Sequence, residues 1–413
     1  MGTYQSDFRR YLKALKGNFT KIAKLDFLNP DGGTAFTVDN AATGRHRGAL
    51  LQSGSLTCNF QNGARRTASV LLSNADEEYS YNVNKLWFGQ NVRLSEGLIL
   101  PDGTEFYIPQ GVFAIKDPNE AWKPNGKTVT LNLVDKWAYL DGTLFGNLDG
   151  IYEVPVGSNI FSAMASVLAL GRGNGQPVDA TAPIFTTYYN GKTQTVPGSG
   201  TVALTLSPYT MRVDSDNGTY ADVILGLNNM LVGVIGYDIN GQLRVEPSQE
   251  DLEDRDKEVL WDFTPTEKQF LGPTYTVLNS QVYNDIIVQG EPQTNYLQPY
   301  GRAQNKNPQS DLSIYGALGR RTLRLRGAGY ATNRQCQDLA DWQLKRQCIL
   351  KKSVTIESNQ IFHIQENKLV TIRRTDKPGD PKEIHLVTGF TRPIGQTGSM
   401  TINATSVEDY AIS

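Results

Sequence analysis

Histidine, the side chain that most often carries protons near neutral pH, is scarce in this sequence. His46, His363 and His385 are the three present in 413 residues. A catalytic dyad or a zinc site needs histidine at fixed spacings from cysteine, carboxylate or other histidine residues, and none of the three stands in such a motif. His46 falls in a basic loop, whereas His363 and His385 fall where strand edges are expected. We interpret all three as surface or half-buried residues without a catalytic role.

Two loops contain residue types that could bind ions. Residues 171–175 (GRGNG) are glycine-rich like a phosphate loop, but they follow an expected helix and open none, so the P-loop and dinucleotide contexts both fail. Residues 214–218 (DSDNG) begin like a calcium loop, but Gly218 is fifth where an EF-hand requires glycine sixth. An Asx-rich turn is the favoured interpretation, with a weak surface cation site near Asp214 as the alternative.

No other pattern predicts catalysis. The chain has no Gly-x-Ser-x-Gly motif, and its many acidic residues single out no carboxylate pair for glycoside hydrolysis. Cys58, Cys336 and Cys348 lack metal-ligand spacing and are expected to be reduced, half-buried thiols. Cys336 and Cys348 fall on one expected helix, ~18 Å apart at ~1.5 Å per residue, too far for a disulfide within that helix. We therefore expect no enzyme activity, no cofactor and no metal.

Residues 319–327 (GRRTLRLRG) have the most unusual charge pattern of the chain. The candidate surface residues are Arg320, Arg321, Arg324 and Arg326. In a strand, all of these but Arg321 share one face with Thr322, while Leu323 and Leu325 point to the other. Like charges at this spacing are unfavourable unless water or opposite charges meet them. Three interpretations stay open: a solvated strand face, an inter-subunit salt-bridge surface, and a nucleic-acid contact.

The composition indicates a globular, β-rich protein that consists of more than one unit. The chain is 39% hydrophobic and 20% charged, with 39 glycines and 19 prolines, which favours strands joined by tight turns. Its length predicts two or three packed units. The net charge of -2 gives no general attraction to nucleic acid. No stretch approaches ~18 consecutive apolar residues, so we expect no membrane span, and the N-terminus has no apolar signal core.

The periodicity predicts a mainly β chain with some α (α+β). Residues 1–19 form an N-terminal arm with an amphipathic helix at 6–16, which must dock on its own domain or on a neighbouring subunit. Residues 20–146 form a first β domain, a small barrel or sandwich. Its expected strands are 22–28, 36–38, 55–60, 67–72, 98–100, 106–108, 111–116 and 128–133.

Residues 147–258 are expected to form a mixed α/β domain. It begins with a helix from residue 160 that has Ser158 as N-cap, and a second helix covers 221–232. A hairpin follows, with strands 234–238 and 243–246 around the Asn240-Gly241 turn. The charged run at 250–258 is interpreted as a solvated linker that ends this domain.

Residues 259–413 are expected to form a second β domain. Two strands, 275–278 and 285–289, come first, followed by a long polar loop at 291–312 and a helix at 332–350. The remaining strands are 353–357, 369–373, 383–392 and 398–406.

Several of these stretches are similar to the baseplate hub proteins of bacteriophage tails and related contractile injection machines. They are 54–60 (GSLTCNF), 65–72 (RRTASVLL), 87–94 (WFGQNVRL), 107–115 (YIPQGVFAI), 283–290 (YNDIIVQG), 339–344 (LADWQL) and 389–400 (GFTRPIGQTGSM). The likeness covers most of the chain in order. Residues 172–220 stand outside it and are expected to be an insertion or decoration.

The resemblance implies two tail-tube-like β-barrel or sandwich domains that flank the mixed middle domain. Three chains would form a ring with pseudo-sixfold symmetry that joins the tail tube or a distal tail protein above to a spike or tip protein below. DNA and the tape-measure protein would pass through the lumen, without sequence-specific binding of nucleic acid. The protein would be made in the host cytoplasm, become part of the virion, and contact no membrane. The arginines of residues 320–326 would then face an acidic partner surface.

Other kinds of tail protein remain as alternatives. A receptor- or carbohydrate-binding tail protein predicts exposed aromatic residues, for which Phe185, Tyr188 and Tyr189 are the candidates. A cell-wall-degrading tail enzyme predicts essential acidic residues. A distal-tail or tube protein predicts hexamers in place of trimers.

Overall fold

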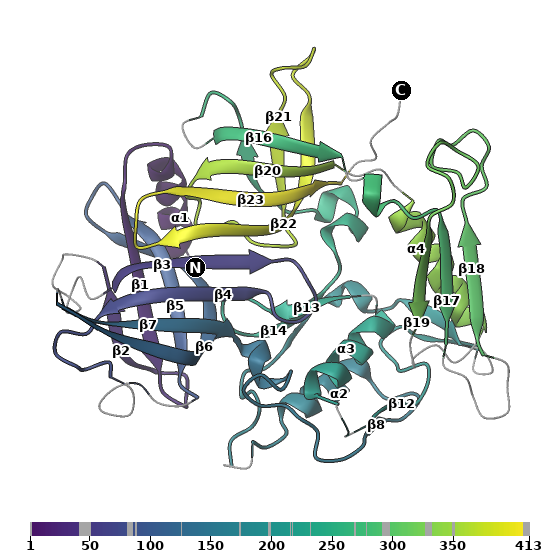
Figure 1. The fold of residues 1–413 in the computed structure, drawn as a ribbon, viewed down its shortest axis with the longest axis horizontal. Helices are drawn as coiled ribbons and strands as arrows, with labels where there is room; N and C mark the ends of the chain where they lie inside the picture. Colours follow the sequence, from purple (N-terminus) through teal and green to yellow (C-terminus); the bar gives the residue numbers. More distant parts are fainter. Residues whose placement is uncertain are drawn as a thin grey trace.

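The computed structural model describes residues 2–407 apart from short gaps. The gaps are residues 41–50, 81–85, 87–88, 125, 173–174, 197–199, 215, 217, 232, 268–269, 278, 291–297, 327–332 and 349–351. Strands predominate over helices in the described chain (Figure 1). The predicted class, mainly β with some α, is therefore confirmed.

Residues 20–135 contribute a run of neighbouring strands to one large sheet. These are β1 (Thr20–Leu28), β2 (Thr34–Asp39), β3 (Leu51–Asn59), β4 (Arg66–Ser73), β5 (Asn91–Ile99), β6 (Glu105–Lys123) and β7 (Gly126–Asp135). Every second residue of β4 is buried or nearly so, as expected for a strand with one face on a core. The strands predicted at 106–108 and 111–116 are one strand, β6, because a bulge at Gln110 between Pro109 and Gly111 lets the strand continue.

Strands from the C-terminal part of the chain complete the same sheet. They are β15 (Val259–Phe263), β16 (Phe270–Val277), β20 (Lys352–Asn359), β21 (Leu369–Arg373), β22 (Lys382–Ile394) and β23 (Ser399–Ser406). The strand order is β16-β20-β23-β22-β3-β4-β7-β6-β5-β1-β2, and β21 pairs with β15 and β22. The two β blocks meet where β22 runs antiparallel to β3, from Gly389 opposite Asn59 to Ile394 opposite Gly54 (Figure 1). They therefore share one sheet.

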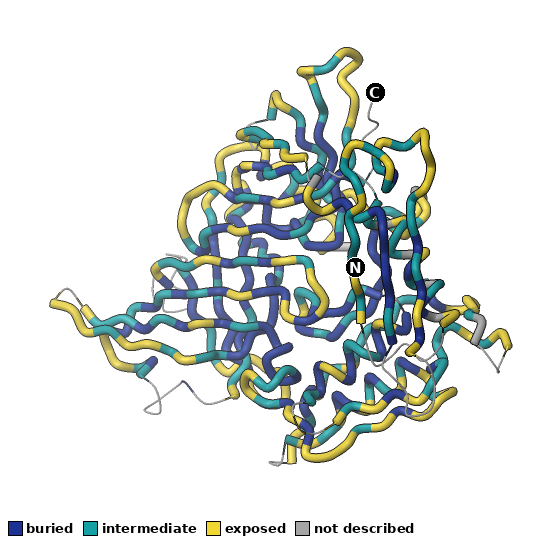
Figure 2. Tube along the Cα trace, turned by 45° about the vertical axis from the view of Figure 1, so that its right-hand side comes forward, coloured by how far each residue is buried: buried dark blue, intermediate teal, exposed yellow. Residues whose placement is uncertain are grey.

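One hydrophobic core also spans the two β blocks. It contains Phe27 and Leu94 from the first block together with Ile356, Phe390 and Ile402 from the last. Figure 2 shows that buried stretches run along the strands of the large sheet, whereas exposed stretches gather at its outer loops. Burial of this apolar surface is the main force that holds the blocks together.

The N-terminal helix, α1 (Gly2–Leu15), packs against this core. Tyr11 and Leu15 are fully buried. The Tyr11 hydroxyl lies 3.0 Å from Nδ1 of His363 and accepts a hydrogen bond from the backbone N–H of Phe362 at 3.1 Å. The helix predicted at 6–16 is confirmed and starts earlier, and in this chain it docks on its own sheet.

The middle of the chain folds as a separate α/β unit with its own core. Its helices are α2 (Ile160–Leu168) and α3 (Tyr220–Leu231), with 3-10 turns η1 (Lys136–Tyr139), η2 (Thr187–Tyr189), η3 (Gln249–Asp251) and η4 (Asp254–Asp256). Its strands are β8 (Tyr152–Val154), β9 (Ile184–Phe185), β10 (Thr193–Val196), β11 (Gly200–Ala203), β12 (Met211–Val213), β13 (Val234–Tyr237) and β14 (Leu243–Glu246). The predicted helices and the β13–β14 hairpin are confirmed.

The predicted N-cap of α2 is wrong by one residue. Asn159 is the cap, because its Oδ1 accepts a hydrogen bond from the backbone N–H of Ser162 at 3.0 Å. The backbone carbonyl of Ser158 instead accepts a hydrogen bond from Ser207, so this residue belongs to the preceding turn.

A small sheet backed by one helix lies apart from the large sheet at the right of Figure 1. It consists of β17 (Asp285–Gln289), β18 (Tyr300–Gln304), β19 (Thr322–Arg326) and α4 (Asn333–Gln347), and a 3-10 turn, η5 (Asn279–Gln281), precedes it. In this sheet β17 is central, antiparallel to β18 and parallel to β19. Ile286, Val288, Ala303, Cys336 and Ala340 form its core.

The long loop predicted at 291–312 is wrong for part of its length, because residues 300–304 form β18. The residues of this strand are mostly polar or small, so they show no alternating apolar pattern. Gly301 and Ala303 are small enough to lie directly against α4. A Cβ on Gly301 would come within 2.3 Å of the backbone carbonyl carbon of Cys336. Close approach to the helix therefore requires glycine here.

Candidate functional site

The arginines predicted to form a surface are placed by β19, at one edge of the small sheet. Leu323 and Leu325 pack toward α4, as expected from the strand alternation. Arg320, Arg324 and Arg326 are exposed. Arg321 does not join them: it is half-buried, and its backbone N–H donates to Oδ1 of Asn284 at 2.8 Å.

Strand register brings two further charged residues to these arginines. Arg302 in β18 and Arg324 in β19 both lie opposite Ile287 of the central strand. Asp285, buried at the start of β17, accepts hydrogen bonds at 2.8 Å from Nε and Nη2 of Arg302. Sequence reasoning missed Arg302 because it assigned residue 302 to a loop, and it missed Asp285 because one acid at a strand start gives no distinctive signal.

Asp285 is the one carboxylate that the described residues bring to this group. Thr322 donates to its Oδ2 at 2.8 Å, and Nε of Arg320 lies 3.8 Å from the same oxygen. The hydrogen bonds from Arg302 lower the pKa of Asp285 despite its burial, so it stays ionised. We call the side chains of Arg302, Arg320, Arg324 and Arg326, with Asp285 among them, the arginine face. Four guanidinium groups against one carboxylate leave this face positively charged.

The arginines of this face differ in the hydrogen bonds and ion pairs that they make. Arg326 donates from Nε to Oε1 of Gln289 at 3.1 Å. Arg324 has neither a hydrogen bond nor an ion pair with any residue that the structure describes. An exposed, unpaired guanidinium group with five donors in a planar fork is suited to bind carboxylate.

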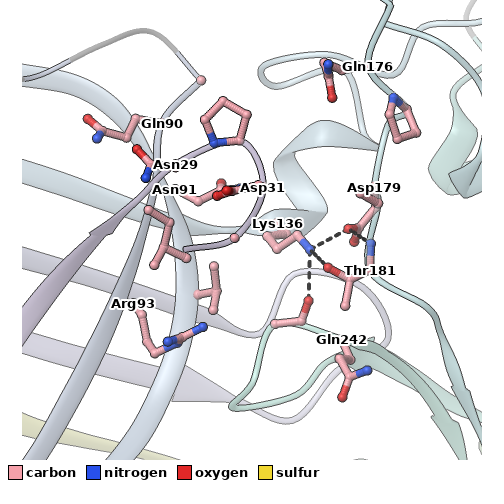
Figure 3. Close-up of a pocket in the computed structure, with 18 of the residues that line it drawn as sticks. Asn29, Asp31, Gln90, Asn91, Arg93, Lys136, Gln176, Asp179, Thr181 and Gln242 are labelled. Atoms are coloured by element: carbon pink, nitrogen blue, oxygen red, sulfur yellow. Dashed lines mark hydrogen bonds and ion pairs between the residues drawn. The ribbon is translucent and has the colours of Figure 1, made fainter. Parts of the chain in front are cut away.

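A pocket of about 650 Å³, lined by both polar and apolar residues, lies between the large sheet and the middle unit (Figure 3). The β1–β2 turn, the start of β5 and the β13–β14 turn surround it, and Asn29, Asp31 and Arg93 are among its lining residues. Lys136 reaches its wall and donates from Nζ to Oδ1 of Asp179 at 2.6 Å and to the carbonyl of Gly241 at 2.9 Å. These bonds join the start of η1, which directly follows β7, to two loops of the middle unit, so we assign Lys136 a structural role.

Burial lowers the pKa of Lys136, and its contact with Asp179 opposes this shift. Two hydrogen bonds join the middle unit to the β blocks. Arg66 donates to the carbonyl of Tyr237 at 2.6 Å, and Asn367 donates to Oε1 of Glu246 at 2.9 Å. The middle unit is therefore held to the sheet by buried polar contacts at several points.

The two described histidines are buried, and the expectation that they are strand-edge residues is wrong. His363 lies in the turn after β20, beneath α1, and its Nε2 is 3.2 Å from the carbonyl of Leu260. His385 lies inside the sheet on β22, flanked by β21 and β23. Burial lowers the pKa of each to about 4, so both are neutral at pH 7. His46 lies outside the described residues.

The three cysteines are free thiols, but two of them are fully buried where half-buried thiols were expected. Cys58 donates to Oε2 of Glu366 at 3.2 Å, and burial raises the pKa of this thiol well above its usual range. Cys336 lies on α4, and Cys348 directly follows the last residue of that helix.

The two loops considered for ion binding, residues 171–175 and 214–218, are only partly described. Arg172 of the glycine-rich loop lies over the ring of Tyr139 at 3.9 Å and donates to the carbonyl of Val178. Asp214 is exposed and pairs with Arg212 at 3.4 Å. Among the described residues, no group of three or more histidine, cysteine and acidic side chains is arranged to hold a metal.

The aromatic residues proposed for carbohydrate binding do not form an exposed cluster. Tyr189 is buried, and Phe185 is stacked on Phe161 at 4.3 Å in the core of the middle unit. Tyr188 is half-buried beside Tyr189. No described helix is both long enough and apolar enough to cross a membrane.

Comparison with solved structures identifies the fold. The chain is similar to a tail protein from Neisseria meningitidis, with a TM-score of 0.56 at 10% identity over 94% of this chain and 96% of that one. It is similar to the 43 kDa tail protein of prophage MuSo2 from Shewanella oneidensis, with a TM-score of 0.56 at 10% identity over 94% and 98% of the two chains. Prophage tail protein gp18 from Listeria monocytogenes aligns at 9% identity with a TM-score of 0.50 over 95% and 96%.

No family model and no curated protein matches the sequence. The solved structures nevertheless confirm the expected likeness to phage tail proteins at the level of the fold. The solved relatives are matched over nearly their whole length, so the likeness includes the middle unit and the small sheet as well as the large one.

Proposed function

We propose that this chain is a structural subunit of a phage tail baseplate, and that it is the hub: three copies form a ring that joins the tail tube to the central spike. The carrying observation is the fold, which is shared with phage tail proteins over nearly the full length of both chains. The proposal assigns no catalytic centre. It places the protein in the virion after synthesis in the host cytoplasm.

The ends of the large sheet support assembly into a ring. Among the described strands, β2 pairs only with β1, and β16 pairs only with β20. Each of these two strands therefore has one side along which no described strand lies, and such a side can pair with a strand of another chain. A closed ring of identical subunits needs two different surfaces that meet each other, and the β2 and β16 sides of this sheet can supply them.

The arginine face supplies a second contact in this proposal. Its excess positive charge fits an acidic surface on a neighbouring subunit or on another baseplate protein. The lumen is a poor location for it, because guanidinium groups would hold the phosphates of DNA that must pass through. The chain's net charge of -2 agrees with a channel that lets DNA and the tape-measure protein move.

Measuring the mass of the purified assembly tests the proposal. A ring of three copies of the 45.6 kDa chain supports the hub. Six copies would point instead to a distal-tail or tube protein, and a chain that stays monomeric when mixed with tube and spike proteins would contradict the hub role. A glycan array that detects binding to host saccharides would favour the receptor-binding alternative.

A further inference from the structure

Within the part of the chain that the structure describes, no backbone hydrogen bond is made along the outer edge of β19. Among the described strands, β19 pairs only with β17, so no described strand lies along its other side (Figure 1). The carbonyl of Arg321 accepts a hydrogen bond from the N–H of Asp285 at 3.1 Å. Since backbone groups alternate from side to side along a strand, those of residues 323 and 325 also face β17. The N–H and C=O groups of Thr322, Arg324 and Arg326 then point to the open side.

The side chains of β19 also alternate, between the two faces of the small sheet. Arg324 and Arg326 stand on the arginine face, on the side of the sheet away from α4. Leu323 and Leu325, on the α4 side, are only half-buried, so the edge leaves apolar surface in contact with water. A strand laid along this edge would place its alternate side chains beside the arginines and the others beside the leucines.

A charged edge strand can also serve to prevent unwanted strand pairing, and lysine is the usual residue for that role. Here every basic residue of the edge is arginine, whose planar fork binds a carboxylate through two parallel hydrogen bonds. Arg324 has no partner within the described chain, although Asp285 satisfies Arg302 nearby. These features favour an edge that binds a partner over an edge that only prevents unwanted strand pairing.

We infer that the outer edge of β19 binds an extended segment of another protein, which adds a fourth strand with acidic residues at alternate positions and apolar residues between them. No described strand of this chain has acidic residues at two successive alternate positions, so none of these strands is the partner. The inference concerns the mode of binding and the sequence pattern of the partner, and it does not depend on the ring.

A peptide of ten residues that alternates glutamate and valine is the probe, with the alternating lysine and valine peptide as control. Binding of each labelled peptide to the full chain is measured by fluorescence anisotropy at low salt. Two substitutions of Arg324 separate the contribution of its charge from that of its backbone N–H group. Arg324→Gln removes the charge, and Arg324→Pro removes the charge together with the outward N–H group, which an edge strand tolerates.

The glutamate peptide is expected to bind wild type and the lysine peptide is not. Arg324→Gln should weaken binding about two- to fivefold, as for loss of one cross-strand charge pair. Arg324→Pro should weaken it more than about tenfold, because a backbone hydrogen bond of the added strand is lost as well. Circular dichroism on both variants checks that the fold is retained.

Three results would overturn the inference. Equal binding by the Gln and Pro variants would place the contact on side chains alone, and equal binding of the two peptides would exclude charge recognition. If the glutamate peptide does not bind and the Arg324→Gln variant self-associates, the arginines of β19 serve to prevent unwanted strand pairing. The ring mass is measured separately, so a chain that binds the peptide but forms no trimer contradicts the hub proposal and supports this one.

Discussion

Arg392 in β22 donates a hydrogen bond from Nε to Oε2 of Glu96 in β5 at 2.7 Å, and neither side chain is exposed to solvent. The two residues belong to different β blocks, so this ion pair lies inside the joint between them. Lys21 of β1 also lies 3.1 Å from Glu96. Gln110, which the bulge in β6 leaves unpaired in the sheet, accepts a hydrogen bond from Arg392 as well.

Replacing Arg392 with methionine is expected to destabilise the protein by about 3–5 kcal/mol, because Glu96 would keep a buried charge without its main partner. Urea unfolding measures the change. The double variant Arg392→Met, Glu96→Leu should recover part of the loss, since it removes both charges of the pair and leaves only Lys21 without its carboxylate. A double variant as unstable as the single one would show that packing, and not the charge pair, holds this joint.

The neutral buried histidines predict a loss of stability in acid. Burial lowers the pKa of His363 and of His385 to about 4, whereas in the unfolded chain each titrates near 6.5. Between these values the unfolded chain binds more protons than the folded one, so stability falls as the pH falls from about 6.5 to about 4. Each histidine contributes on the order of 3 kcal/mol to the full change.

Urea unfolding at several pH values across this range tests the effect. His363→Gln should remove its share of the slope while leaving the share of His385. A slope that is unchanged in this variant would mean that His363 does not titrate between the two states.

Removing the hydroxyl of Tyr11 should loosen the N-terminal helix. Tyr11→Phe leaves the backbone N–H of Phe362 without its acceptor beneath α1, which we expect to cost about 1–3 kcal/mol of unfolding free energy. Tyr4→Phe is the matched control, because Tyr4 is on the same helix and 57% exposed. Hydrogen exchange should show faster exchange in α1 of the first variant only.

Adding a methyl group at Gly301 tests the close contact between β18 and α4. The new Cβ would meet the helix backbone at 2.3 Å, so Gly301→Ala should destabilise the small sheet by about 1–3 kcal/mol. At Gly150 a Cβ would meet nothing within 4 Å, so Gly150→Ala is the control and should have little effect. Similar melting temperatures for the two variants would contradict the contact.

Reversing the charge of Arg324 tests whether the arginine face takes part in assembly. Arg324→Glu should leave the monomer folded, since this side chain is exposed, and should weaken assembly by about tenfold or more, because repulsion replaces attraction to an acidic partner. Arg9→Glu, an exposed reversal on α1, is the control. Analytical ultracentrifugation of both variants with the baseplate partners gives the comparison, and unchanged assembly by Arg324→Glu would remove the face from the interface.

Local signals in the sequence predicted local structure well. Apolar residues at helical spacing identified α1, and Asn240-Gly241 between alternating strands identified the β13–β14 hairpin, because both depend on residues close in sequence. The same alternation identified the two faces of β19 and therefore the candidate arginines.

Long-range contacts could not be predicted in this way. The pairing of β22 with β3 joins residues more than three hundred positions apart, and nothing in either strand specifies the other. Strand β18 was missed because its stability comes from β17 and α4 and not from its own apolar residues. Arg302 and Asp285 entered the candidate site only through that pairing.

The pairing of β22 with β3 also constrains how the protein folds during synthesis. A ribosome completes β3 and β4 long before β22 exists, so the newly made first block must wait with one side of β3 unpaired and part of its core open. Contacts so distant along the chain slow folding, and an open strand edge invites aggregation in the interval. A fragment that ends near residue 146 should therefore be far less soluble than the full chain.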